Sequence, residues 1–189
     1  MIKSFPFLFI FSVICSSISF SQKSNETSVA PDLPISDKTG LITYKEVVEV
    51  EGLSDDQLFD KSLQWANGFY KNPKNVIRTS DKSSVTLVCK GRYRMNNPPN
   101  KKGVVTSAGD AMYKLTINFK DGRYRYEITE FNWLKTSAFP AERWLDTSSQ
   151  SYSPVYISYL EQTDQKTKAI IASLKATMAA PVDEAVEDW

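Results

Sequence analysis

Hydrophobic and polar residues alternate most regularly over Ala111–Trp133, on both sides of Asp121-Gly122. Alternation with a period of two is typical of β-strands that bury one face. An Asp-Gly pair favours a two-residue hairpin turn, because Gly adopts positive φ without strain. The resulting register pairs Phe119 with Tyr124, Ile117 with Tyr126 and Leu115 with Ile128. The pattern therefore predicts an antiparallel hairpin with one apolar and one polar face.

Three further strands are predicted before this hairpin. Gly40–Val50 and Val85–Met95 alternate in the same manner, and Val76–Thr79 is a shorter apolar segment. The prolines and glycines of Asn96–Gly109 cannot continue a strand, so this segment is predicted to be a loop.

A helix is predicted between the first two strands. Ser54 is a suitable N-cap, and Gln57, three residues later, completes a capping box. The apolar stripe expected to face the sheet has helical spacing and comprises Leu58, Ser62, Trp65, Ala66 and Phe69.

A second, longer helix is predicted near the end of the chain. Ser153-Pro154 should begin it, with Ser153 as the N-cap and Pro154 at the first helical position, and Ala179-Ala180-Pro181 should end it. Lys135–Ser153 is predicted to be irregular and to fold back over the sheet, because it contains large apolar side chains. The expected buried stripe comprises Tyr156, Leu160, Thr163, Thr167, Ile170, Ile171, Leu174 and Met178.

These elements predict an α+β fold in the order β-α-β-β-β-β-α. An antiparallel sheet of about five strands would carry both helices on one face, and the single domain would cover residues 37–180. Residues 181–189 are predicted to form an acidic disordered tail. Residues 22–36, which are polar and contain two prolines, are predicted to be a flexible tether.

Residues 1–21 have the pattern of a cleaved signal peptide. A basic start is followed by a short apolar run and by Ser19-Phe20-Ser21, a small-x-small cleavage pattern. Ile14 stands before Cys15 where a lipoprotein signal has a small residue, which argues against lipidation. No later segment is long and apolar enough to span a membrane. The chain is therefore expected to be exported, and to be periplasmic or secreted.

Composition narrows the chemistry. Without residues 1–21 the chain has 22 basic and 22 acidic side chains, a balance that argues against general nucleic-acid binding. It contains no histidine, which excludes histidine-based catalytic triads and the commonest zinc ligand. Cys89 is expected to be a small buried residue. No cofactor or metal motif is present in the sequence.

Two motifs resemble a known family. They are the segment Gly40–Phe59 (GLITYKEVVEVEGLSDDQLF) with Trp65 after it, and Asp121–Tyr126 (DGRYRY) before an acidic and aromatic strand end. Together they resemble an exported bacterial family catalogued as domain of unknown function 4468, over about residues 34–133. The resemblance implies a fold like that of the TATA-binding protein. It implies no catalytic residues, and fold alone does not imply DNA binding.

One hypothesis for a binding site is a basic strip on the polar face of the sheet. It comprises Lys90, Arg92 and Arg94 on one strand and Arg123 and Arg125 on another, with Lys114 and Lys120 between them. If the strands are neighbours, the strip could bind an anionic ligand, and arginine suits bidentate recognition of oxyanions. Alternatively, these side chains form a solvated face and pair with Glu49, Glu127 and Glu130.

A second hypothesis is a pocket for a small ligand between the sheet and the C-terminal helix. Its lining would be Tyr93, Tyr113, Tyr124, Tyr126, Tyr156 and Tyr159, which combine an apolar ring with a polar hydroxyl. The alternative is that these rings form an aromatic core and leave no cavity.

A third hypothesis is acid–base chemistry by Glu46 and Glu130, which both have the inward parity of their strands. Alternatively, Glu46 pairs with an inward-reaching Arg or Lys. The sequence favours a non-catalytic binding or interaction module of the bacterial envelope. A carrier of an apolar or amphipathic ligand is the alternative, and a carboxylate-dependent hydrolase the third. The partner is expected to be an envelope protein, a glycan or a small ligand.

Overall fold

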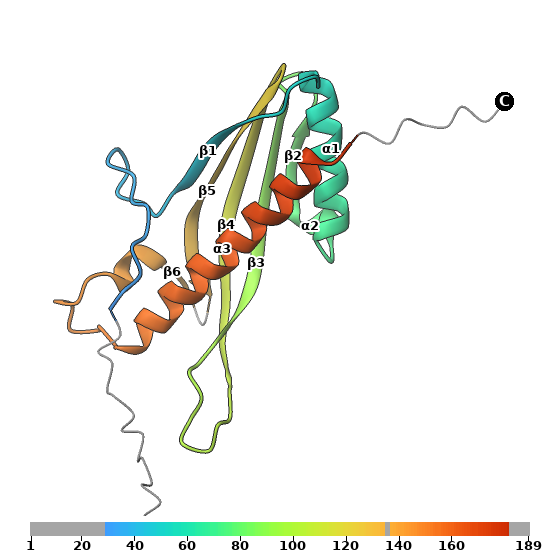
Figure 1. The fold of residues 1–189 in the computed structure, drawn as a ribbon. Helices are drawn as coiled ribbons and strands as arrows, with labels where there is room; N and C mark the ends of the chain where they lie inside the picture. The colour runs from blue at the N-terminus through green and yellow to red at the C-terminus, as the bar shows by residue number, and fades with distance from the viewer. Residues whose placement is uncertain (1–28, 135–136, 182–189) are drawn as a thin grey trace, which may run out of the picture.

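The structure is a computed structural model, and it describes residues 29–134 and 137–181 (Figure 1). Two of its helices, α1 and α3, are long, and its strands form one sheet. The elements in chain order are β1 (Tyr44–Glu49), α1 (Asp55–Phe69), α2 (Pro73–Val76), β2 (Ile77–Asp81), β3 (Thr86–Asn96), β4 (Ser107–Lys120), β5 (Arg123–Leu134), β6 (Ala138–Pro140), a 3₁₀ helix (Ala141–Trp144) and α3 (Val155–Ala179). The predicted α+β class and the predicted order of the main elements are confirmed.

The strands form an antiparallel sheet in the order β1-β5-β4-β3-β2, and β6 pairs with the end of β5. Both long helices lie on one face of this sheet, α3 diagonally over its middle and α1 against β3, β4 and β5 (Figure 1). The opposite face carries no helix among the described residues. The sheet therefore has six strands, one more than predicted, because β6 lies in the segment that was expected to be irregular.

The central hairpin has the predicted register. Phe119 lies opposite Tyr124, Ile117 opposite Tyr126 and Leu115 opposite Ile128. The register shifts between Met112 and Lys114, where Glu130 on β5 has a φ of 56°. Such a bulge inserts one extra residue and reverses the parity of the residues beyond it. Phe131 consequently points into the core, and Glu130 does not have the inward orientation that was predicted for it.

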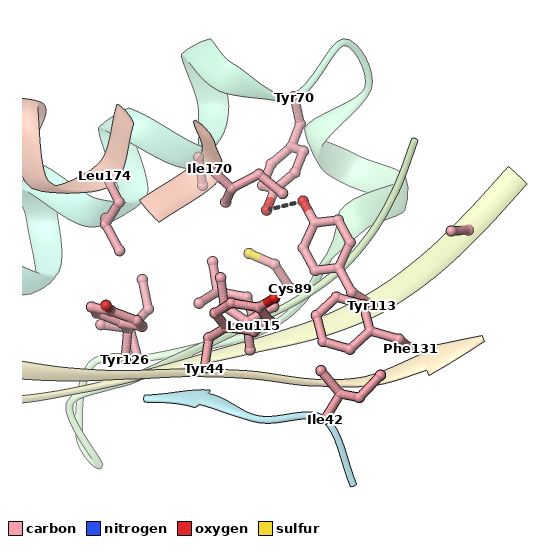
Figure 2. Close-up of a cluster of buried hydrophobic side chains, with 14 of the residues drawn as sticks. Ile42, Tyr44, Tyr70, Cys89, Tyr113, Leu115, Tyr126, Phe131, Ile170 and Leu174 are labelled. Atoms are coloured by element: carbon pink, nitrogen blue, oxygen red, sulfur yellow. Dashed lines mark hydrogen bonds between the residues drawn. The ribbon is translucent and has the colours of Figure 1, made fainter. Parts of the chain in front are cut away.

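The core lies between the sheet and the two helices. Strand residues such as Cys89, Leu115 and Phe131 meet Ile170 and Leu174 of α3 and Tyr70 at the end of α1 (Figure 2). Cys89 is buried, as expected. Contact between an apolar sheet face and two helical stripes removes this surface from water, which is the main stabilisation of such a fold.

Helix α1 begins as predicted. The Ser54 side chain accepts a hydrogen bond from the Gln57 backbone, and the Gln57 side chain accepts one from the Ser54 backbone. Its buried residues include Phe59, which was not predicted and which packs edge-on against Phe119. Phe69 was predicted to be buried but is 40% exposed, because it lies at the last residue of the helix and stacks on Trp65.

The second long helix begins one residue later than predicted. The Ser153 side chain makes no capping hydrogen bond, and Pro154 occupies the N-cap position. The backbone carbonyl of Ser153 accepts a hydrogen bond from Tyr156 instead. Tyr159, which was missed, is buried together with Leu160 and the rest of the predicted stripe, whereas Tyr156 and Ile171 are half-buried.

Other corrections concern element boundaries. Residues Pro73–Val76 form a short helix, because Pro73 is compatible with the first helical turn, and β2 begins only at Ile77. β4 begins at Ser107, inside the predicted loop, because Gly109 adopts a φ of 106° that lets the strand continue through a bulge opposite β3.

Part of the predicted tether is packed on the domain. Leu33 is only 7% exposed, Ile35 bridges to Ile42, and Thr43 donates a backbone hydrogen bond to Pro34. The predicted signal peptide, residues 22–28 of the tether and residues 182–189 lie outside the described residues. Within the described residues, no helix is long and apolar enough to cross a membrane.

Candidate functional site

The predicted basic strip is divided into two groups, because β4 lies between β3 and β5. Arg123 and Arg125 stand opposite Lys120 and Asn118 near the hairpin turn, whereas Lys90 stands opposite Lys114. The hypothesis required the two strands to be neighbours, but β4 separates them, and the two groups of side chains also lie at different heights along the sheet. The five residues do not form one continuous surface.

Several of these side chains have acidic partners, as the alternative hypothesis expected. Arg94 lies 2.6 Å from Asp110, and Lys114 lies 2.8 Å from Glu130. Arg123 is 4.0 Å from Glu49. Arg125, together with Lys120 and Arg123, borders a hollow of about 430 Å³ beside Val47. At Arg94, Lys114 and Arg123, the opposite charge within about 4 Å offsets part of the positive potential.

The group on β3 lies beside a larger groove. β2 pairs with β3 only as far as Cys89, so the next residues of β3 form an edge of the sheet. The connection from the end of α1 through α2 passes beside this edge. Between them lies a groove of about 690 Å³, lined by Tyr70, Lys71, Asn72, Asn75, Val76, Arg78, Lys90, Gly91, Arg92 and Met112.

The charge of this groove is entirely positive. Its lining contains Lys71, Arg78, Lys90 and Arg92 and no acidic residue. Within residues 29–134 and 137–181, none of these four side chains makes an ion pair. Four cations around one concavity give a local positive potential, which attracts anions although the net charge of the whole chain is only +1. The groove is the strongest candidate site of the described part of the chain.

Tyr70 lines the groove and is hydrogen-bonded to Tyr113, a buried residue of the core. The Tyr113 hydroxyl donates a hydrogen bond to the Tyr70 hydroxyl at 3.1 Å, which joins β4 to the end of α1 (Figure 2). Burial raises the pKa of Tyr113 to about 12 and that of Tyr70 further. Both hydroxyls therefore stay neutral at ordinary pH, and Tyr70 does not oppose an anion in the groove with negative charge.

The six predicted pocket tyrosines do not converge on one cavity. Tyr93 and Tyr113 stack on each other and border a pocket of about 350 Å³ that also touches Ile170 of α3. Tyr156 and Tyr159 pack around Trp144 at the other end of α3. The remaining two, Tyr124 and Tyr126, are buried on β5 under the helices. Most of these rings fill the core, as the alternative hypothesis expected.

The two predicted carboxylates are held separately. Glu46 accepts hydrogen bonds from Lys175 of α3, at 2.6 Å, and from the Tyr126 hydroxyl, at 2.7 Å. The bond from Lys175, and then that from Tyr126, lowers the pKa of Glu46. Glu130 is turned to its partner Lys114 by the bulge in β5. The described residues also contain no group of three metal-ligating side chains.

Two residues of the groove, Lys71 and Arg78, were not predicted from the sequence. Lys71 follows α1 and Arg78 is the second residue of β2, so neither shares a strand with Lys90 and Arg92. The short distance between Asn72-Pro73 and the next strand was the available signal, because it restricts how far this connection can move from the sheet. That Lys71 and Arg78 lie beside Lys90 and Arg92 follows only from the order of the strands in the sheet.

Residues 44–133 match a family model described as "Domain of unknown function (DUF4468) with TBP-like fold", where TBP is the TATA-binding protein. This match confirms the predicted resemblance. No curated protein matches the chain.

Two solved structures have a similar fold. A DUF4468 family protein from Bacteroides ovatus has 18% sequence identity and a TM-score of 0.64, over 85% of this chain and 98% of that chain. A TBP-like protein from Parabacteroides distasonis has 18% identity and a TM-score of 0.59, over 79% of this chain and 99% of that chain. At this identity the likeness establishes the fold only.

Proposed function

The chain carries a DUF4468 domain with a TBP-like fold over residues 44–133, and we propose that this domain is a binding module for an anionic ligand. The ligand would occupy the groove between the end of α1, α2 and β3. The observation that carries the proposal is the convergence of Lys71, Arg78, Lys90 and Arg92 on one concavity without an acidic neighbour in its lining.

The chemistry of these side chains suits oxyanions. The guanidinium groups of Arg78 and Arg92 can each donate two parallel hydrogen bonds to a phosphate, sulfate or carboxylate. Lys71 and Lys90 add point charges on flexible stems. Asn72 and Asn75 supply neutral donors in the lining. This combination favours a ligand with more than one anionic group, because the four cations are spread around the groove.

The lining also favours binding over catalysis. It contains no carboxylate, thiol or hydroxyl nucleophile beside a base, and the chain has no histidine. Tyr70 contributes a hydroxyl group to the lining, and burial raises its pKa, so this hydroxyl stays protonated. We therefore propose that the ligand is held and released unchanged.

We further propose that this binding takes place in the bacterial envelope. The proposal rests on residues 1–21, whose basic start, apolar run and small-x-small pattern are typical of a cleaved signal peptide. Amino-terminal sequencing of the protein from its own cells would test it. A first residue of Gln22 supports export, and an intact Met1 would contradict it.

Titration calorimetry of the purified protein with pyrophosphate and with citrate tests the binding site. We expect binding that weakens as salt rises, because the groove attracts its ligand by charge. Arg92→Glu should weaken binding about tenfold or more, the loss of a charge-assisted contact of about 1.5–3 kcal/mol. The control is Lys101→Glu, which makes the same charge change on an exposed residue of the β3–β4 loop.

An equal loss in both variants would show a general charge effect and would contradict the groove. No binding of either anion would contradict the proposed function itself.

A small-ligand carrier is the second candidate, and one observation favours it. Tyr93 and Tyr113 border the pocket of about 350 Å³ beneath α3, together with Phe69 and Ile170. Native mass spectrometry of the protein from its own envelope fraction distinguishes the two. A retained small apolar mass, lost on denaturation, would support the carrier.

A further inference from the structure

We infer that the edge of β3 beside the groove accepts an extended acidic peptide of a partner protein as an additional β-strand. The inference rests on the proposed function, since the peptide is a particular anionic ligand of the same groove. Besides the attraction of its charges to the groove, the peptide would gain affinity from main-chain hydrogen bonds with Arg92 and Arg94. In such strand addition, backbone hydrogen bonds supply affinity and alternate side chains supply specificity.

The edge begins where β2 ends. The last residue of β3 in the β2–β3 register is Cys89, which pairs with Ile77. β3 continues for seven residues more, to Asn96, and over this length it pairs with β4 alone. Beyond Cys89, one side of β3 is therefore without a neighbouring strand among the described residues.

The alternation of a β-strand tells which backbone groups face this open side. The carbonyl of Val85 accepts a hydrogen bond from Phe119 of β4, and the N–H of Asn97 donates one to Thr106 on the same side. Residues at even positions between them have their backbone groups on the opposite side, because successive residues of a strand alternate. The N–H and C=O of Arg92 and Arg94 thus face the open edge.

Asn96 supports this assignment. Its N–H donates to the Gln162 side chain at 3.0 Å, and its C=O accepts from the same side chain at 2.9 Å. Gln162, on α3, thereby takes the place that a neighbouring strand would have at this residue. The protein satisfies the edge at Asn96, whereas Arg92 and Arg94 retain backbone groups for an external partner.

The side chains select an acidic strand. Lys90 and Arg92 are two residues apart, about 6.6 Å along the strand, and project from the same face. Acidic side chains at alternate positions of an added strand would have the same spacing and would lie beside them. Lys71 and Arg78 flank the same space from the connection and from β2. Arg94 contributes its backbone only, since its side chain is paired with Asp110.

Charged residues on an edge strand can also serve to prevent aggregation. That role needs charges that project into solvent, and Arg94 meets it. It does not require four cations from three separate segments around a concavity. The concave arrangement therefore favours a bound strand.

The test is fluorescence anisotropy of the purified protein with the labelled peptide TEVEVET. A second version has N-methylated backbone amides, which keeps the charges but prevents strand pairing on one edge. We expect the methylated peptide to bind about tenfold more weakly, the value of one or two net backbone hydrogen bonds. Amide hydrogen exchange, read at single residues, should slow at Arg92 and Arg94 when the unmodified peptide is bound.

Arg92→Glu should weaken the binding of the peptide, and Lys101→Glu should leave it unchanged. Equal binding of both peptides, or unchanged exchange at Arg92 and Arg94, would overturn the inference. If pyrophosphate binds in the groove while the peptide does not, the inference fails and the proposed function stands. If neither binds, both fail.

The chain's own acidic segment, residues 182–189, is the competing occupant. The same titration with a chain that ends at Pro181 separates the two. Equal affinity for both chains supports a partner strand. Peptide binding that requires removal of residues 182–189 would assign the edge to this segment and overturn the inference.

Discussion

The ring of Tyr113 lies directly over the backbone of Gly91. A Cβ on Gly91 would stand 2.3 Å from both Cζ and the hydroxyl oxygen of Tyr113, a distance that no real side chain adopts. The absence of a side chain at Gly91 is therefore what allows Tyr113 to cross β3 and reach Tyr70. One glycine thus lets a core side chain reach Tyr70, which lines the basic groove.

Gly91→Ala should destabilise the protein. The added methyl group must displace the Tyr113 ring, and overpacking of this kind costs about 1–3 kcal/mol. Denaturant unfolding followed by tyrosine and tryptophan fluorescence measures the change. The control is Gly68→Ala, because Gly68 lies in α1 with no atom near its missing Cβ. That change should stabilise the helix by about 0.5–1 kcal/mol. Equal effects of the two variants would contradict the close packing at Gly91.

Ser54→Ala should weaken the start of α1. The Ser54 side chain accepts the hydrogen bond from Gln57, and loss of an N-cap of this kind costs about 1 kcal/mol. The same unfolding measurement applies. Ser153→Ala is the matched control at α3, where the serine side chain makes no capping hydrogen bond. A comparable loss at Ser153 would show that the caps are not the cause.

Glu46→Gln should make stability less dependent on acidic pH. Lys175 lowers the pKa of Glu46 below its ordinary value of 4.5. A carboxylate with a lowered pKa contributes stability above its ordinary pKa and loses it as pH falls through the folded-state pKa. Because both partners are partly exposed, we expect a difference of about 0.5 kcal/mol at pH 7.

This difference between the native protein and Glu46→Gln should disappear at low pH. Urea unfolding at pH 7 and at several values below 4.5 measures it. Glu127→Gln is the control, since Glu127 has no ion pair within the described residues. A constant difference for Glu46→Gln at every pH would contradict the role of its charge.

Arg92→Glu and Arg125→Glu should have different effects on anion binding. The two arginines lie on strands that β4 separates, and only Arg92 borders the larger groove. Arg92→Glu should lower the affinity for citrate about tenfold, whereas Arg125→Glu should change this affinity by less than about twofold. Calorimetry measures both, and unfolding curves show whether either variant is destabilised. The reverse order would move the site to the hollow beside Val47.

Local signals in the sequence were sufficient for much of the fold. The Asp121-Gly122 turn fixed the register of the central hairpin, and Ser54 with Gln57 located the start of α1. Both depend on residues close to each other in the chain. Periodicity also identified most of the buried stripe of α3.

The rest depends on contacts between distant segments. Glu130 adopts positive φ and points away from the core because of a bulge in β5. No glycine or proline at this position indicates the bulge in the sequence. Phe69 has the helical spacing of the buried stripe but is 40% exposed, because it is the last residue of α1.

The basic groove could be predicted only in part. Lys90 and Arg92 were identified from strand parity, but they do not group with Arg123 and Arg125, because β4 separates their strands. The alternation of residues along a strand gives no information about the order of strands in a sheet. Lys71 and Arg78 join them only when the connection after α1 is placed beside β3.

The pairing of β1 with β5 also determines when this sheet can be completed. Tyr44 lies opposite Ile128, so the first strand must wait for a partner more than 80 residues later in the chain. The β4–β5 hairpin, closed by two residues, can form early, whereas closing a long loop has a larger entropic cost and slows folding. We expect β1 to remain without its partner strand until the emerging chain includes β5, so the first strand should be the last of this pair to become ordered.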